Sequence, residues 1–176
     1  MDILLVLYHQ KKHHGLHCQS FVYICHYCDR PTYFEHHFDN NHNIREKIQI
    51  PGVAIGSDIK HLPQEISQLY NEIRNSTSLG ADTLAILGCR KLLMHIAVEQ
   101  GAQEGLNFVS YVDYLVSKNF TPPNSKPWVD KIRSKGNEAN HEIKIMTNAN
   151  ANEVIVFIGM IMQFIYSFPA EANLTP

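Results

Sequence analysis

Three polar residues in the last third of the chain have a spacing that could support chemistry. Arg133, Asn137 and His141 follow one another at intervals of four residues. In a helix this spacing places them on one face, with a drift of about 40° per step. A charged guanidinium, an amide and an imidazole that titrates near neutrality would then share one surface. Such a stripe can bind a phosphate and move a proton.

In an enzymatic interpretation, this stripe would cleave RNA without a metal ion. His141 would act as general base or acid on the ribose 2′-hydroxyl, and Arg133 would stabilise the charge that develops on the phosphate. Asn137 would orient the phosphate or the imidazole. Lys131 and Lys135 lie close by in the sequence and would add local positive charge.

In a structural interpretation, the same residues form polar contacts between helices. Asn137 and His141 would satisfy backbone groups where the helix meets its neighbours, and Gly136 would let another helix approach. Glu138 and Glu142 flank the stripe and would repel a phosphate, which favours this interpretation.

A second polar patch follows from Arg90 and Lys91, with His95 one turn later. This patch could line the same nucleic-acid-binding groove as the Arg133 stripe, or it could be a solvated helix face.

The elements that must position these residues are helices, because apolar residues recur with helical spacing from Leu62 onward. The fold class is therefore predicted as mainly α, a bundle of four or five helices with short connections. In the second helix, Leu84 and Leu92 are placed on the inner side, and Gly88 permits close packing by a neighbouring helix. The predicted helices cover residues 63–75, 81–100, 106–118, a segment from Trp128 through the polar stripe, and the apolar segment 154–168.

The C-terminal segment Val154–Phe168 is the most hydrophobic part of the sequence. It is shorter than the roughly 20 apolar residues that a membrane-spanning helix needs, and Pro169 follows it. We therefore expect a core helix or a subunit interface, with a homodimer formed through this helix and no membrane association.

The N-terminal residues 1–50 differ in composition from the rest. They are rich in His, Cys, Tyr and Phe, and short strand-like runs occur at 21–24 and 31–34. Residues 51–61 contain Pro and Gly and predict a linker, after which the helical bundle occupies 62–170.

Cys25 and Cys28 form a Cys-x-x-Cys pair of the kind that aims two thiolates at one zinc ion. A closed structural site needs four ligands, so Cys18 is a candidate for the third and His36 for the fourth. His17, His37 and His42 compete with His36 for the fourth position. One structural zinc is thus predicted, and the open alternatives are a knuckle that has lost its metal, or a disulfide or redox role.

Composition describes an ordinary soluble globule, with 44% hydrophobic and 18% charged residues. The net charge of −2 provides no global basic field for nucleic acid or anionic membranes, so phosphate recognition would have to be local. No cleaved signal is recognisable, and clustered Cys and His favour a reducing, cytoplasmic compartment.

Several landmarks occur in a fixed order, and together they resemble a known family. They are Leu62-Pro63-x-x-Ile66-x-x-x-Tyr70, then Ala81 leading into Gly88-Cys-Arg90-Lys91-Leu92-Leu93, then Ile132-Arg133-x-x-Gly136-Asn137-x-x-x-His141. Over about residues 20–170 the chain resembles the bacterial domain-of-unknown-function family 4145, within the HEPN superfamily of helical bundles. Members often carry an N-terminal Cys-x-x-Cys knuckle, which Cys25 and Cys28 match.

The resemblance implies a HEPN-like bundle, often dimeric, that also occurs attached to type I restriction endonuclease motor subunits. HEPN ribonucleases carry an Arg and, four to six residues later, a His, and two copies of the chain form a composite active site across the dimer. In this chain Gly136 stands before Asn137, and the nearest arginine is Arg133, one turn earlier.

We therefore expect a non-catalytic, nucleic-acid-associated binding or dimerisation module of a prokaryotic defence or restriction-type system, with RNA or a defence protein as possible partners. One alternative is a metal-independent endoribonuclease that uses Arg133 and His141 across a dimer. The other is a pure protein–protein interaction domain.

Overall fold

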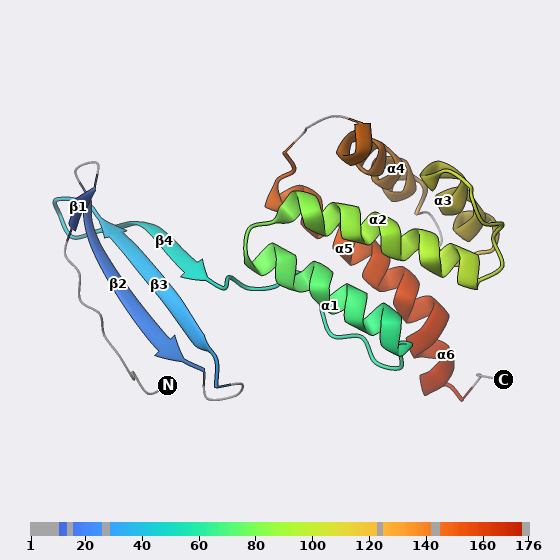
Figure 1. Ribbon diagram of the computed structural model, residues 1–176, viewed down its shortest axis with the longest axis horizontal. Helices are drawn as coiled ribbons and strands as arrows, with labels where there is room; N and C mark the ends of the chain where they lie inside the picture. The colour runs from blue at the N-terminus through green and yellow to red at the C-terminus, as the bar shows by residue number, and fades with distance from the viewer. Residues whose placement is uncertain (1–10, 14–15, 26–28, 123–124, 142–144, 174–176) are drawn as a thin grey trace. The chain divides into compact units, whose positions relative to one another are not determined.

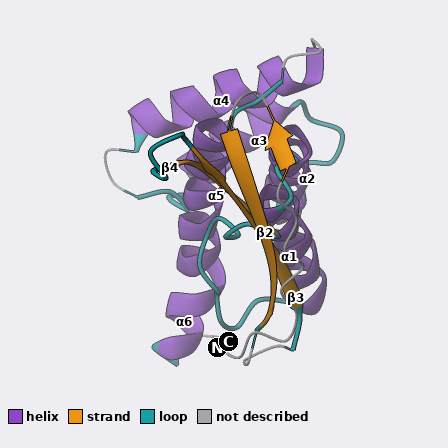
Figure 2. Cartoon of the chain, turned by 90° about the vertical axis from the view of Figure 1, so that its left-hand side faces the viewer, coloured by secondary structure: helices purple, strands orange, loops and turns teal. Residues whose placement is uncertain are grey.

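The computed structural model describes residues 11–13, 16–25, 29–122, 125–141 and 145–173, and the side chains in these ranges except those of 11–13, 16, 126 and 135–141. The chain divides into two compact units, Met1–Val53 and Ala54–Pro176. Strands occur in the first unit and helices in the second (Figures 1 and 2). The prediction of a mainly α protein with an N-terminal β segment is confirmed.

The first unit is an antiparallel sheet in the order β1-β2-β3-β4. Its register aligns Cys18 with His37 and Ser20 with Glu35. Since side chains directly opposite each other share a face of the sheet, these four residues lie on one face. The strands are β1 (Lys11–His13), β2 (Leu16–Ile24), β3 (Pro31–Phe38) and β4 (Ile44–Ile50).

The opposite face of the sheet is aromatic. The rings of Tyr23 and Phe34 pack edge to face with centroids 5.2 Å apart, and His36 packs against Phe21 at 5.7 Å and Phe38 at 6.2 Å. Such edge-to-face pairs stabilise a sheet beyond the area that they bury.

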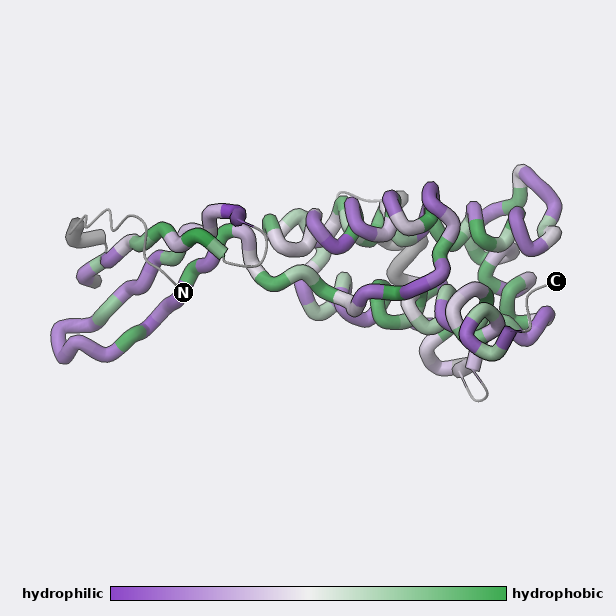
Figure 3. Tube along the Cα trace, turned by 90° about the horizontal axis from the view of Figure 1, so that it is seen from below, coloured by the Kyte–Doolittle hydropathy of each residue, from purple (hydrophilic) through white to green (hydrophobic). Residues whose placement is uncertain are grey.

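The second unit is a helical bundle, and its helices match the predicted segments closely. Helix α2 contacts α1, α3, α4 and α5, so it lies at the centre of the bundle (Figure 1). Hydrophobic and hydrophilic residues alternate along these helices, as expected of amphipathic helices (Figure 3). The elements are α1 (Gln64–Ser78), α2 (Asp82–Glu99), α3 (Phe108–Ser117), α4 (Lys126–His141), α5 (Asn148–Met162), the π-helical turn η1 (Gln163–Ser167) and α6 (Phe168–Glu171).

Two residues of α2 test the predicted inner side of that helix. Gly88 meets a neighbouring helix as expected, because a Cβ atom there would lie 2.7 Å from Cγ1 of Ile73 on α1. The placement of Leu84 was wrong, since its side chain is 64% exposed. The smaller residues Ala85 and Cys89, both fully buried, occupy the packed side instead.

The residues predicted as a linker are irregular, and those after Val53 belong to the helical unit. The backbone N–H of Ile55 donates to Thr77 Oγ1 at 3.1 Å, and Arg74 pairs with Asp58. Gly56 has a φ of +83°, and a Cβ atom there would lie 2.6 Å from the Tyr70 hydroxyl. A glycine thus lets this segment lie directly against α1.

Helix α5 is the buried core helix of the bundle. It begins at a capping box in which Thr147 and Asn150 exchange hydrogen bonds, and it continues through η1 and α6. By length and composition, Asn148–Glu171 could cross a membrane, but core helices of soluble proteins meet the same criterion. Its contacts with α2, α1 and α4 fit the core interpretation.

Candidate functional site

Arg133, the first residue of the predicted stripe, is engaged by two carboxylates. Its guanidinium forms ion pairs with Asp113 of α3 and with Asp130, which lies 2.7 Å away on its own helix. Its Nε atom is buried and has no hydrogen-bond partner among the described residues. A phosphate that binds this guanidinium would therefore compete with the two carboxylates.

The remaining residues of the stripe, Asn137 and His141, lie in α4, as the sequence predicted. Their side chains lie outside the described part of the structure, as does that of Lys135.

The predicted basic residues with described side chains have different surroundings. The guanidinium carbon of Arg90 lies 4.5 Å above the ring of Phe108 on α3, and burial lowers the pKa of Arg90. Lys91 is exposed on the next position of α2. Lys131 points to α5, where its Nζ atom lies 2.5 Å from Glu153. Arg90 and Lys131 thus contact different helices.

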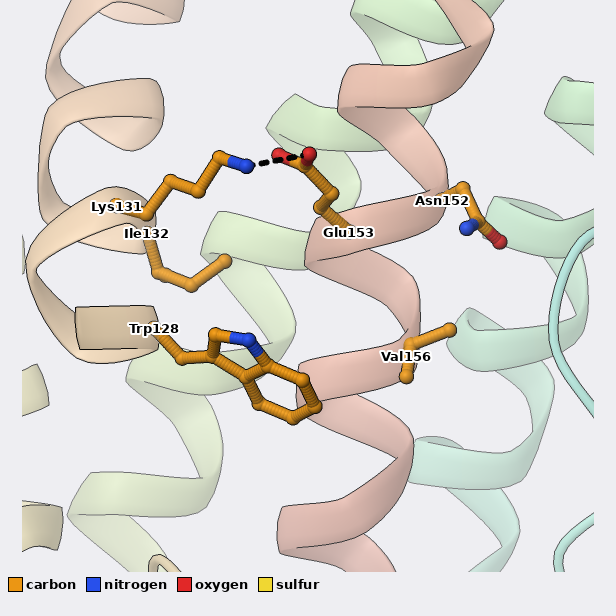
Figure 4. A pocket seen from close by; sticks show the side chains of 6 residues that line it. All are labelled: Trp128, Lys131, Ile132, Asn152, Glu153 and Val156. Atoms are coloured by element: carbon orange, nitrogen blue, oxygen red, sulfur yellow. Dashed lines mark hydrogen bonds and ion pairs between the residues drawn. The ribbon is translucent and has the colours of Figure 1, made fainter. Parts of the chain in front are cut away.

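A groove opens between α4 and α5, on the side of α4 that carries Lys131 (Figure 4). It has a volume of about 190 Å³. Trp128 and Ile132 of α4 line it together with Val156 of α5, and the Lys131–Glu153 ion pair bridges the two helices beside them (Figure 4). The second carboxylate oxygen of Glu153 is buried without a hydrogen-bond partner among the described residues. The groove is therefore apolar, with one ion pair at its edge.

Val156 of the groove is also the first residue of an exposed apolar seam that runs along α5, η1 and α6. We define this seam as Val156, Met160, Phe164 and Phe168, which recur every four residues along α5, η1 and α6. Val156, Phe164 and Phe168 are 39%, 42% and 48% exposed, and Trp128 beside the groove is 48% exposed. The rings of Phe164 and Phe168 stack edge to face with centroids 5.5 Å apart. Exposed aromatic and aliphatic side chains in one row are typical of an interaction surface.

Two of the predicted metal ligands, Cys18 and Cys25, lie near opposite ends of strand β2, and His36 lies on β3. Cys25 follows β2 at the turn toward β3, which is closed by hydrogen bonds from Cys25 N to Arg30 O and from Asp29 N to Cys25 O. Cys28 lies outside the described residues. Cys18 is seven residues before Cys25, a distance of roughly 23 Å along an extended strand. His36 faces the aromatic side of the sheet, so of the predicted ligands that are described, Cys18, Cys25 and His36 do not come together.

Cys18 lies instead beside two residues of β3, Glu35 and His37. The ligand atoms of these three residues all lie within 4.8 Å of one another. Hydrogen bonds from Tyr33, His37 and Cys18 lower the pKa of Glu35 to about 2, so its carboxylate is charged at neutral pH. Burial, followed by the contact with Glu35, raises the pKa of the Cys18 thiol. Glu35 was missed in the sequence because the predicted strand ended at residue 34.

The model of a protein family described as a domain of unknown function (DUF4145) matches residues 71–174. The chain belongs to the DUF4145 family. The match begins within α1 and includes every later helix, the groove and the apolar seam. The sheet with Cys18, Glu35 and His37 precedes the DUF4145 segment. No curated protein and no solved structure matches the chain.

Proposed function

We propose that this DUF4145 protein is a non-catalytic binding module whose HEPN-like helical bundle forms a homodimer through the groove and the apolar seam. Its setting would be a nucleic-acid-associated defence or restriction-type system of a prokaryote. The observation that carries the proposal is the set of exposed apolar residues formed by Trp128 and the seam. Arg133, which lies on the other side of α4, is already held by two carboxylates.

The non-catalytic part of the proposal rests on Arg133. A residue that stabilises a phosphoryl transition state acts by placing its charge on the developing negative charge, and carboxylates that already contact it offset that charge. The guanidinium of Arg133 already faces Asp113 and Asp130, which supports a role in holding α3 and α4 together. The acidic neighbours also reduce the local positive potential that a polyanion would need.

A second copy of the chain is the occupant that the seam fits best. No residue from Val154 to Ala170 is charged, so two seams can face each other without like-charge repulsion. In a two-fold dimer the same surface of both subunits meets, so that surface must be complementary to itself. An uncharged apolar row is complementary to a second copy of itself whether the two helices run parallel or antiparallel. Its aromatic residues are of the kind enriched in interface cores.

Sedimentation of the full chain at micromolar concentration tests the dimer. We expect a homodimer for the natural protein and a monomer for Val156→Glu or Phe164→Glu, because a charge buried without a partner is costly. Leu84→Glu is the matched control, since Leu84 is an exposed aliphatic residue on α2 away from the seam. It should remain dimeric. A monomeric natural protein, or a dimer unaffected by both seam variants, would refute the interface.

A second experiment addresses RNA. The purified protein is incubated with labelled single-stranded RNA, with and without EDTA, beside His141→Ala. We expect no cleavage. Metal-independent cleavage that disappears in His141→Ala would establish the ribonuclease instead. Salt-sensitive binding without cleavage would support the nucleic-acid association, and its absence would leave a pure protein–protein module.

A further inference from the structure

One face of the sheet carries a cluster of metal-binding side chains that does not include Cys25. Cys18 on β2 is aligned with His37 on β3, and Glu35 lies two residues before His37 on the same face. Thiolate, imidazole and carboxylate are the three ligand types that proteins use for zinc. The strand register, rather than a flexible loop, holds them within 4.8 Å of one another.

The carboxylate of Glu35 is oriented by its neighbours. The Tyr33 hydroxyl donates to Oε2 of Glu35, and the hydroxyl oxygen of Tyr33 lies 3.0 Å from Ser20 Oγ. These contacts fix one carboxylate oxygen and leave the other, Oε1, directed at His37. Oε1 lies 2.5 Å from Nε2 of His37.

The imidazole of His37 has carboxylates at both ring nitrogens. While Nε2 faces Glu35, Nδ1 lies 3.3 Å from Oε2 of Glu46 on β4. A metal-bound histidine commonly donates its other N–H group to a carboxylate, which fixes the tautomer and strengthens the ligand. Glu46 is placed for that role, so that Nε2 would carry the lone pair for an ion.

The geometry points to a zinc-binding site in which Cys18 Sγ, Glu35 Oε1 and His37 Nε2 are the protein ligands, Glu46 supports His37, and water completes the tetrahedron. The sulfur and nitrogen ligands favour zinc over magnesium or calcium, which prefer oxygen. Ligand atoms around a tetrahedral zinc lie roughly 3.3–3.8 Å apart, so an ion would widen the Nε2–Oε1 contact by about 1 Å. Partial exposure of Glu35 and His37 gives the ion access from solvent.

A metal-free alternative is a protonated His37 that bridges Glu35 and Glu46 as a triad of ion pairs. The two arrangements differ in what Cys18 does, because the thiol has no necessary role in the triad. They also differ in whether a stoichiometric ion is present.

The experiment measures zinc content and Co²⁺ binding of the full chain, after removal of metal with a chelator. The reference is Cys25→Ser/Cys28→Ser, which lacks the thiols of the turn. We expect it to bind one equivalent of zinc and to give a thiolate-to-cobalt charge-transfer absorption. Adding Cys18→Ser should abolish that absorption and weaken binding at least 100-fold, and Glu46→Gln should weaken it by roughly 10- to 100-fold.

Two adjacent histidines of the natural chain provide a control for variants that lose zinc because they unfold. His36 and His37 are adjacent on β3 but face opposite sides of the sheet. His37→Ala should lose one equivalent of zinc, whereas His36→Ala should retain it, with circular dichroism confirming the strands in both. Absence of zinc and cobalt binding from the folded reference variant would overturn the site. Binding that survives Cys18→Ser, or that depends equally on His36 and His37, would overturn it as well.

Discussion

Arg133 on α4 and Asp113 on α3 form an ion pair that joins the two helices at the start of the polar stripe. Lys131, two residues earlier, lies on the opposite side of α4 and pairs with Glu153 of α5. Lys131 and Arg133 therefore hold α4 against different neighbours. The stripe that first indicated phosphate chemistry begins with a contact between helices.

The Arg133–Asp113 pair predicts a measurable but small coupling energy. Because the two side chains are 27% and 52% exposed, we expect about 0.5–1 kcal/mol in a double-mutant cycle of Arg133→Gln and Asp113→Asn. Urea denaturation of the four proteins measures it, and high salt should reduce it. The matched cycle of Lys131→Gln with Asp113→Asn should be additive. Zero coupling in the first cycle would mean that the Arg133–Asp113 contact does not stabilise the packing of α3 against α4.

Much of the helical unit could be predicted, because the spacing of apolar residues shows which segments form helices with one apolar face that can pack in a core. The error at Leu84 came from giving weight to bulky side chains. The packed side of α2 contains Ala85 and Cys89, whose small size lets neighbouring helices approach. The ion pair of Arg133 with Asp113 could not be predicted, because it depends on which side of α4 faces α3.

The β unit was harder to predict, since its candidate site depends on register. Tyr33, Glu35 and His37 alternate along one strand and thus share a face, a signal that was present once the strand was extended beyond residue 34. The alignment of Cys18 with His37 depends on the length of the turn that joins β2 to β3, which periodicity does not reveal. Strand β4 is largely exposed and gave no clear apolar pattern.

Two glycines inside helices should respond to alanine with opposite signs. At Gly88 a Cβ atom would lie 2.7 Å from Cγ1 of the buried Ile73, so Gly88→Ala should destabilise the protein by about 1–2 kcal/mol despite its better helix propensity. At Gly159 the nearest atom, the Tyr70 hydroxyl oxygen, would be 3.5 Å away. Gly159→Ala should therefore stabilise by up to about 1 kcal/mol.

Thermal and urea unfolding of both glycine variants measure these effects. Adding Ile73→Ala to Gly88→Ala should cost less than the sum of the two single changes, since the new methyl group enters the space that Ile73 leaves. Equal stabilisation by both alanines would show that α1 and α2 are not in close contact at Gly88.

Tyr166 of η1 predicts a loss of stability at alkaline pH. Its hydroxyl donates to a carboxylate oxygen of Glu99 at the end of α2, and burial, followed by this hydrogen bond, raises its pKa. The folded protein then keeps the phenolic proton above pH 10, where the unfolded chain releases it. This contribution is fully present below about pH 10 and falls as the pH rises further, because the unfolded state then gains from ionisation.

Ultraviolet titration of tyrosinate, combined with unfolding at several alkaline pH values, measures this effect. Tyr166→Phe should remove one late-titrating phenol and make stability less steep in alkali. Glu99→Gln keeps the ring buried but removes the carboxylate, so Tyr166 should titrate earlier than in the natural protein and later than a free tyrosine. If Tyr166→Phe leaves the late part of the titration unchanged, the contact between η1 and α2 does not hold the phenolic proton.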